Sequence, residues 1–312
     1  MTRRTFLPLP LAGTAAAGSA RPLTLGILAD PQYADKDVWK QRHYRASLDK
    51  LRRAIRRLNE LEPDAVLTLG DFIDEDFASF APVMKVYGEL RGRHLKVVGN
   101  HDFSVDEERK DEVFDALSMV APHASHEFDG WRVVLLDGTE VSTYRPRDAE
   151  TAREWLGRLE REGRPQAQPW NSAIGRAQLA WLEEQLQAAT DARQRVLVAC
   201  HLPVFPEDPH NLWNDRELVA LVDRFPCVAA WFAGHNHAGH YGRRGHCHYL
   251  TFQGMVETAD HAPFGLLMAA SGWLEFAGVA CFATVMLGTA ATGSRRSDPT
   301  ALLFTASALW FL

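Results

Sequence analysis

The feature that most constrains the fold is a series of short apolar runs, each of which ends at a polar cluster. The runs cover residues 23–28, 65–69, 95–98, 131–136, 195–199, 228–233 and 248–253. Amphipathic segments lie between them, above all residues 44–61 and 174–189, where apolar side chains recur at helical spacing. Arginines 52, 53, 56 and 57 fall mainly on the opposite side of the first segment, where we expect solvent. Short strands alternating with amphipathic helices predict an α/β layered sheet.

Two segments fall outside this pattern. Residues 142–168 are polar and rich in Arg and Glu, and we expect an insertion over one end of the sheet. Residues 266–268 and 273–277 predict a closing hairpin, and the rest of 266–312 is an atypical apolar tail. Its run 277–290 is shorter than the ~20 residues that a membrane helix needs. A damaged or read-through C-terminus explains this tail as well as a functional one does, so we assign it no function.

The N-terminal residues 1–20 have the three parts of a secretory signal. Arg3 and Arg4 provide a charged start, a short apolar run follows, and small residues end at Ala20. Paired arginines before Phe6 and Leu7 resemble a twin-arginine export signal. We therefore expect an exported, periplasmic or extracellular protein whose main domain spans residues 21–265. A disordered tail on a cytoplasmic protein is the alternative.

Composition limits the kind of partner. The formal net charge of −6 and the pI near 6.1 argue against binding to a nucleic-acid polymer, which favours basic surfaces. A mildly acidic protein can still act on phosphates where metal ions supply local positive charge. The cysteines at positions 200, 227, 247 and 281 show no paired spacing, so we expect buried free thiols. One disulfide stays possible if the protein is exported, and the sequence predicts no oligomeric state.

Polar residues of the types that commonly bind metals follow five of the apolar runs. They are Asp30, Asp71, Asn100, His201 and the pair His235 and His237. One aspartate at a strand end is usually a turn or helix cap. Five such clusters in sequence are hard to explain by capping, and the carboxyl ends of strands in an open α/β sheet share one binding crevice. We therefore expect these side chains to converge.

The residue types suit two adjacent divalent ions. Carboxylate oxygens and imidazoles together favour Mn, Fe, Co or Zn. Asp71 would bridge both ions through its two oxygens, at the ~3.5–4 Å separation of two-metal hydrolytic sites. Asn100 would add an amide oxygen without adding negative charge to a site that an anion must approach.

The motifs together resemble the calcineurin-like metallophosphoesterase superfamily. They are Asp30-x-Gln32, Gly70-Asp71-x-x-Asp74, Gly99-Asn100-His101-Asp102, His201 and Gly234-His235-x-His237. The resemblance implies a layered sandwich of central mixed β-sheets flanked by helices, with the metal site at the carboxyl ends of the strands. It implies one ion on Asp30, Gln32, Asp71 and His237, and a second on Asp71, Asn100, His201 and His235. It also implies that His101 faces the leaving-group oxygen, with Asp102 orienting its ring.

Gln32 narrows the resemblance to one branch of the superfamily, because most of its members have histidine at this position. A carbonyl oxygen makes the site harder and favours manganese, with Fe, Zn, Co or Mg as alternatives. The segments around Gln32, Asn171 and Trp213 are similar to manganese-dependent ADP-ribose/CDP-alcohol diphosphatases. That similarity implies substrate contacts by Tyr33, Trp170, Asn171, Trp213 and Asn214. Ser172 and Ala173 depart from the Trp-Asn-Gly-Gly motif of that branch, and core packing is the alternative role for both tryptophans.

The expected function is hydrolysis of a small phosphorylated substrate, such as a nucleoside diphosphate derivative. Export makes a broad phosphodiesterase or phosphomonoesterase the alternative, because such nucleotides are chiefly cytoplasmic. A non-catalytic metal-binding relative and a membrane-anchored enzyme are the other readings.

Overall fold

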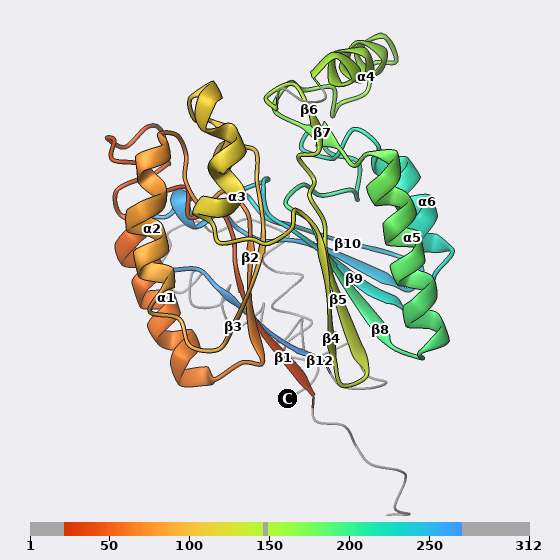
Figure 1. Cartoon of the computed structure of the whole chain (residues 1–312), viewed down its shortest axis with the longest axis horizontal. Helices are drawn as coiled ribbons and strands as arrows, with labels where there is room; N and C mark the ends of the chain where they lie inside the picture. The colour runs from red at the N-terminus through yellow and green to blue at the C-terminus, as the bar shows by residue number, and fades with distance from the viewer. Residues whose placement is uncertain (1–21, 146–148, 270–312) are drawn as a thin grey trace, which may run out of the picture.

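The computed structural model describes residues 22–145 and 149–269, which form two central β-sheets between two outer layers of helices (Figure 1). The first sheet has the strand order β12-β1-β2-β3. Its strands are β1 (Leu23–Leu28), β2 (Ala65–Leu69), β3 (Arg93–Val97) and β12 (Gly265–Ala269). Strands β1, β2 and β3 are parallel, and β12 closes the edge antiparallel to β1.

The second sheet has the strand order β10-β11-β9-β8-β5-β4. Its strands are β4 (Ala124–Phe128), β5 (Trp131–Leu135), β8 (Arg195–Ala199), β9 (Val228–Ala233), β10 (His240–Arg244) and β11 (Cys247–Thr251). The inner four strands are parallel, whereas β4 and β10 are antiparallel edges. Strands β6 (Val141–Ser142) and β7 (Ser172–Ala173) form a separate two-stranded ladder.

Helices cover the outer face of each sheet (Figure 1). Those beside the first sheet are α1 (Ser47–Leu61) and α2 (Phe80–Tyr87), and those beside the second are α5 (Arg176–Asp191) and α6 (Asp215–Asp223). Two further helices, α3 (Val113–Ala116) and α4 (Ala149–Arg161), lie towards one end of the sheets. Short 3₁₀ segments are η1 (Phe77–Ser79), η2 (His101–Phe103), η3 (Glu107–Glu112) and η5 (Met255–Glu257).

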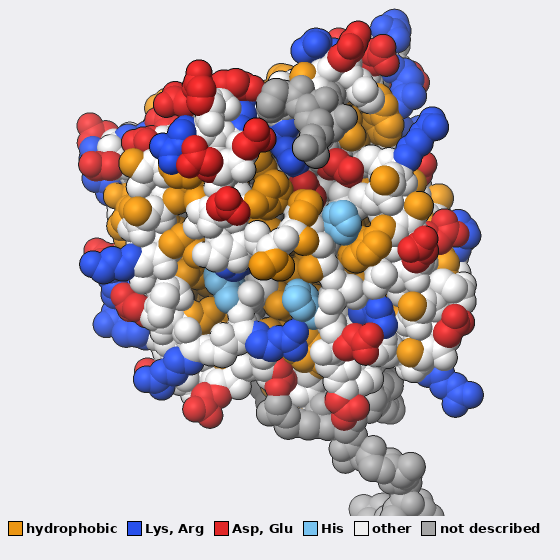
Figure 2. All heavy atoms as spheres, in the orientation of Figure 1, with side chains coloured by type: hydrophobic (Ala, Val, Ile, Leu, Met, Phe, Trp, Pro, Cys, Tyr) orange, Lys and Arg blue, Asp and Glu red, His pale blue; other side chains and the backbone are white. Residues whose placement is uncertain are grey.

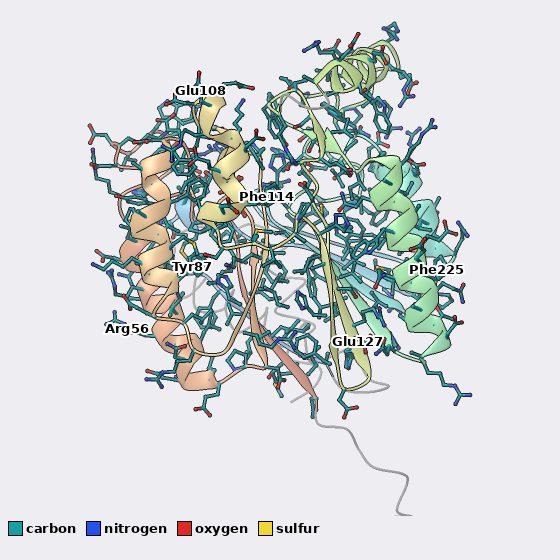
Figure 3. The ribbon with its side chains drawn as sticks, in the orientation of Figure 1. Arg56, Tyr87, Glu108, Phe114, Glu127 and Phe225 are labelled. Carbon is teal, nitrogen blue, oxygen red and sulfur yellow. The ribbon has the colours of Figure 1, made fainter. Side chains whose placement is uncertain are left out.

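Three apolar layers hold these elements together. The layer between the sheets contains Ile27, Leu67 and Leu197. A second layer packs α1 and α2 on the first sheet, and a third packs α5 and α6 on the other, with Phe225 beside α6. In Figure 3, Arg56 extends from the outer side of α1, as its exposure and the helical spacing require. Burial of one face of each sheet and helix is the main force that fixes this arrangement.

The predicted fold class, a sandwich of mixed sheets flanked by helices, is confirmed. The polar insertion predicted at residues 142–168 contains α4, and the β6–β7 ladder pairs the segments at its two ends; these elements lie beyond one end of the main sheets (Figure 1). Strands β4 and β10 and helices α2 and α6 were not among the predicted elements. Residues 265–269 pair with β1, so the sheet extends past the predicted domain end at 265.

Several predictions fall on residues that the structure does not describe. These are the export signal at 1–20, the second arm of the closing hairpin at 273–277, the apolar tail and Cys281. Cys200, Cys227 and Cys247 are free thiols, and Cys227 is half-buried. Within residues 22–145 and 149–269, no helix is long and apolar enough to cross a membrane.

Lys50 is a buried cation that joins α1 to the segment around η5. Its ammonium group donates to the carbonyl oxygens of Met255 and Thr258, at 2.6 Å in each case. Burial lowers the pKa of Lys50 from its ordinary 10.5 to about 8. The contact matters for the site described below, because Glu257 lies within the segment that Lys50 holds.

Replacing Lys50 by Met leaves these carbonyl oxygens without a donor, so we expect a loss of about 1–3 kcal/mol in the free energy of unfolding. A lowered pKa contributes stability that is fully present above pH 10.5 and is lost as the pH falls through about 8. The gap between the wild type and Lys50→Met should therefore widen from pH 8 to pH 10 in urea titrations. The exposed Lys85→Met is the control, and an equal pH dependence in both variants would refute this role.

Candidate active site

The polar clusters that follow β1, β2, β3, β8 and β9 meet at one end of the two sheets. Two groups of side chains have ligand atoms that all lie within 4.8 Å of one another. The first group is Asp30, Asp71 and His237, and the second group is Asp71, His201 and His235. Asp71 belongs to both groups, so its carboxylate lies where one side chain can serve two neighbouring ions.

The chain turns sharply after these strands to bring the side chains inwards. Asp30, Gln32, Asp71 and His235 have positive φ values of 47°, 42°, 52° and 65°. Such left-handed conformations cost an L-residue of order 1–3 kcal/mol each and persist only where surrounding contacts fix them. Gly99 permits the closest approach, because a Cβ atom there would lie 2.1 Å from Oδ1 of Asp71.

The first group contains oxygens that suit a cation. Oδ2 of Asp30 and Oε1 of Gln32 are buried and accept no hydrogen bond from the described residues. Nε2 of Gln32 donates to Oδ2 of Asp71 at 2.8 Å and lies 3.2 Å from Nε2 of His237. Rotation of the amide by 180° exchanges its oxygen and nitrogen, which would place the oxygen beside the carboxylate of Asp71 and the ring of His237. Carboxylate, amide and imidazole donors in this arrangement fit a divalent ion.

The second group is equally compact and fully buried at His201. Nε2 of His201 lies 3.2 Å from Oδ2 of Asp71 and 3.2 Å from Oδ1 of Asn100. Its other ring nitrogen, Nδ1, donates to the carbonyl oxygen of Leu69 at 2.6 Å. That bond turns Nε2 towards the carboxylate and the amide, so an ion that displaces the proton of Nε2 would find three ligands already oriented. The third member of this group, His235, packs edge-on against His201 at 5.0 Å between ring centres.

Charge in this buried site is finely balanced. Burial alone would lower the pKa of His201, but the charge of Asp71 and its hydrogen bond raise that pKa to about 9. Burial also opposes the charged form of His237, yet hydrogen bonds to two carboxylates raise its pKa to about 9. Burial and the neighbouring His201 hold the pKa of His235 well below its usual value. Nearby positive charge thus stabilises the carboxylates, and divalent ions would displace protons from the rings of His201 and His237.

The structure corrects the predicted role of Asp102. This buried carboxylate does not contact the ring of His101. Its oxygens accept four backbone N–H groups, those of Gly99, Asp71, Phe72 and Ile73, at 2.7–3.2 Å. Asp102 therefore fastens the loop after β2 to the loop after β3. The orienting role falls to Asp74, whose Oδ1 lies 3.0 Å from Nδ1 of His101.

His101 belongs to neither group of candidate ligands. Its backbone N–H donates to Oδ1 of Asp71 at 2.8 Å, while its ring turns towards Asp74. Asp74 also accepts a hydrogen bond from Lys36. Burial lowers the pKa of His101, but the charges of Asp71 and Asp74 outweigh it and hold that pKa above its usual value. Asp74 was visible in the sequence motif, although its contact with His101 could not be read there.

The five residues with predicted substrate contacts have different surroundings. Trp213 is buried in a small apolar cluster, and its Nε1 donates to the carbonyl oxygen of Gln168, which supports core packing. Asn214 exchanges hydrogen bonds with the backbone of Ile174. Trp170 is 45% exposed, so core packing does not explain it. Tyr33 is half-buried and pairs with Ile73 in an isolated β-bridge. Asn171 is fully buried against His235.

A pocket of about 400 Å³ opens beside the motif that contains His235 and His237. Its walls are formed by Gln41, Arg42, His210, His235, Asn236, His237, Ala238, Gln253 and Glu257. Arg42 lies 3.4 Å from Glu257, which in turn accepts from Nδ1 of His237 at 2.8 Å. Arg42, Glu257 and His210 were not predicted as site residues, since none belongs to a strand-end motif. Acidic and basic side chains are mixed over the face shown in Figure 2.

Comparison with known proteins agrees with this geometry. The profile of the calcineurin-like phosphoesterase family matches residues 23–239. The manganese-dependent ADP-ribose/CDP-alcohol diphosphatase of Xenopus tropicalis is 30% identical over 290 residues, which cover 75% of this chain and 84% of that protein. The enzyme of the same name from Oryza sativa subsp. japonica is 30% identical over 284 residues, covering 78% and 87%. A dimetal phosphatase from Danio rerio has the same fold, with a TM-score of 0.70 at 23% identity, covering 80% of this chain and 93% of that one.

Proposed function

The chain belongs to the calcineurin-like phosphoesterase family and is a metal-dependent phosphoesterase, and on that premise we propose a two-metal hydrolase that cleaves nucleoside diphosphate derivatives of the ADP-ribose or CDP-alcohol type. The observation that carries the proposal is the carboxylate of Asp71, which belongs to two ligand groups at once. Relatives named for this activity, at about 30% identity over most of their length, support the substrate class.

Seven side chains of this chain would hold the ions. Asp30, Gln32, Asp71 and His237 would bind one, and Asp71, Asn100, His201 and His235 the other. Divalent ions held there supply a nucleophile at neutral pH and neutralise charge on the phosphoryl oxygens. The amide oxygen of Gln32, in a position where an imidazole would be softer, favours manganese. Relatives whose names specify manganese dependence support the same choice.

His101 would complete the reaction on the leaving-group side. Hydrolysis breaks one P–O bond, adds hydroxyl to phosphorus and leaves an oxygen that needs a proton. Nδ1 of His101 faces Asp74, so Nε2 is the atom left to donate that proton. Asp74 holds the ring in this orientation, and Lys36 holds Asp74.

We also propose that residues 1–20 direct export of the folded enzyme. An enzyme outside the cytoplasm would meet nucleotides released from cells, which bears on how broad its substrate range is. Cell fractionation without detergent tests the location, and retention in the cytoplasm or in the membrane fraction would contradict it.

A substrate panel tests the activity directly. The purified chain is assayed on ADP-ribose, CDP-choline, cyclic AMP and bis-p-nitrophenyl phosphate, with Mn²⁺, Mg²⁺ or EDTA. We expect manganese-dependent release of AMP from ADP-ribose and of CMP from CDP-choline, and no turnover in EDTA. Cleavage of the generic diester alone would reject the substrate class and keep the phosphoesterase. A folded, manganese-loaded protein without turnover on any of the four would reject the hydrolase.

A double-mutant cycle tests the Asp74–His101 pair. We expect His101→Ala to lower kcat by roughly 10²–10⁴-fold with unchanged metal content, because a proton donor is lost and no ligand is. If Asp74 acts through His101, the double variant His101→Ala/Asp74→Ala should be no slower than His101→Ala alone.

The matched control for this cycle is Glu75→Ala, since Glu75 contacts the same Lys36 but not His101. Its kcat should stay near that of the wild type. Fully additive losses, or loss of metal in His101→Ala, would contradict the roles given to the two residues.

A further inference from the structure

Asn171 belongs to the predicted substrate group, and its side chain hydrogen-bonds a candidate metal ligand. It is fully buried, precedes β7, and has its Oδ1 2.9 Å from Nε2 of His235. We propose that Asn171 is a positioning residue for the second metal: it fixes His235 in the tautomer that carries its proton on Nε2, so that Nδ1 faces the ion. This inference rests on the proposed role of His235 as a ligand.

The orientation of the Asn171 amide is settled by its other partners. Nδ2 donates to the carbonyl oxygen of Gln166 at 3.0 Å and to that of Pro209 at 2.7 Å. Both hydrogens of the amide nitrogen are therefore used on two carbonyl oxygens, which can only accept. With the amide flipped, its oxygen would face two acceptors and both of these hydrogen bonds would be lost. Oδ1 must consequently be the atom that faces His235.

The amide orientation decides the tautomer of His235. An amide oxygen can only accept, so the 2.9 Å contact requires the proton on Nε2 of the imidazole. A neutral imidazole carries one proton, and Nδ1 then keeps the lone pair that a metal ion needs. The backbone fixes the rest of the residue, because the N–H of His235 donates to Oδ1 of Asp30 at 3.0 Å.

His235 differs in this respect from the other two histidines of the site. His201 donates from Nδ1 to Leu69, and the contact of Nδ1 in His237 is with Glu257, so both turn Nε2 inwards. His235 turns its ring the other way and needs an acceptor on the Nε2 side. Asn171 supplies it from a segment that contributes no candidate ligand of its own.

The contact gives the polar insertion a function. Gln166 lies in the loop after α4, and Pro209 lies in the loop that follows β8. Asn171 joins both loops to His235 through three hydrogen bonds. The insertion thus sets the affinity of the second ion from outside the ligand set, as outer-sphere hydrogen bonds do at other metal sites.

The tautomer can be read in the metal-free protein. Long-range ¹H–¹⁵N correlation spectra of the ¹⁵N-histidine-labelled chain distinguish a protonated ring nitrogen from a bare one, and His235→Gln identifies the signals of His235. We expect Nε2 to be the protonated atom in the wild type, and the signals to shift towards the other tautomer in Asn171→Leu. A proton on Nδ1 in the wild type would overturn the proposal.

Metal titration provides the second readout. Free Mn²⁺ is followed by electron paramagnetic resonance while the chain is titrated, which separates two binding steps. We expect Asn171→Leu to weaken one step by about 10–100-fold and to leave the other unchanged. Asn171→Asp keeps an acceptor for Nε2 while it loses both donated bonds, so it should stay within a few-fold of the wild type.

Asn211→Leu is the matched structural control. Asn211 is equally buried and donates Nδ2 to Pro206 and Asp215, but it contacts none of the candidate ligands. Weakening by Asn211→Leu or Asn171→Asp as strong as that by Asn171→Leu would assign the effect to loop packing and refute the proposal. A wild type that binds a single Mn²⁺, while its apoprotein spectrum still shows the Nε2 proton, would contradict the proposed two-metal hydrolase but not the tautomer of His235.

Discussion

The rest of the site depends on the buried carboxylate of Asp71. It lies just beyond β2 with no exposed surface, and its Oδ2 is 2.8 Å from Nε2 of Gln32 and 3.2 Å from Nε2 of His201, which belong to different ligand sets. An uncompensated carboxylate in that position would be very costly, so the charges of His201 and His101 hold the pKa of Asp71 well below its usual range. The conformation at Asp71 is also strained, with φ at 52°. A fold keeps such a residue where the strain and burial are offset by binding.

Asp102 and Asn171 show how the surrounding protein holds this centre. Asp102 gathers four backbone N–H groups from the loops after β2 and β3, which keeps Asp71 and Asn100 side by side. Asn171 lies just after the insertion and orients His235. Glu257 does the same for His237 from the far end of the chain, on a segment that Lys50 fastens. The candidate ligands follow the strand ends. Asn171 and Glu257, which orient two of them, lie outside the strand-end motifs, whereas Asp102 belongs to the same motif as Asn100.

The sequence predicted the parts of this arrangement that follow from hydrophobic periodicity. Buried parallel strands such as β8 and β9 are continuous apolar runs, so their ends and the polar residues after them could be located. Strand β10 was missed because its residues are largely exposed and two of them are arginines. The partners of His101 and the buried position of Trp213 depend on contacts between distant segments. The orienting role of Asp102 was implied by the family resemblance, whereas Asp74 is brought to the ring by the loop after β2.

The measurement that most directly tests the central claim is anomalous diffraction at the manganese edge from crystals of the Mn²⁺-soaked protein. A carboxylate shared between two ions predicts two peaks about 3.5–4 Å apart, one on each side of Asp71. Crystals of Asp71→Asn should lose at least one of them, because a neutral amide bridges two cations poorly. One peak in the wild type at saturating Mn²⁺, or two peaks that Asp71 does not separate, would contradict the account.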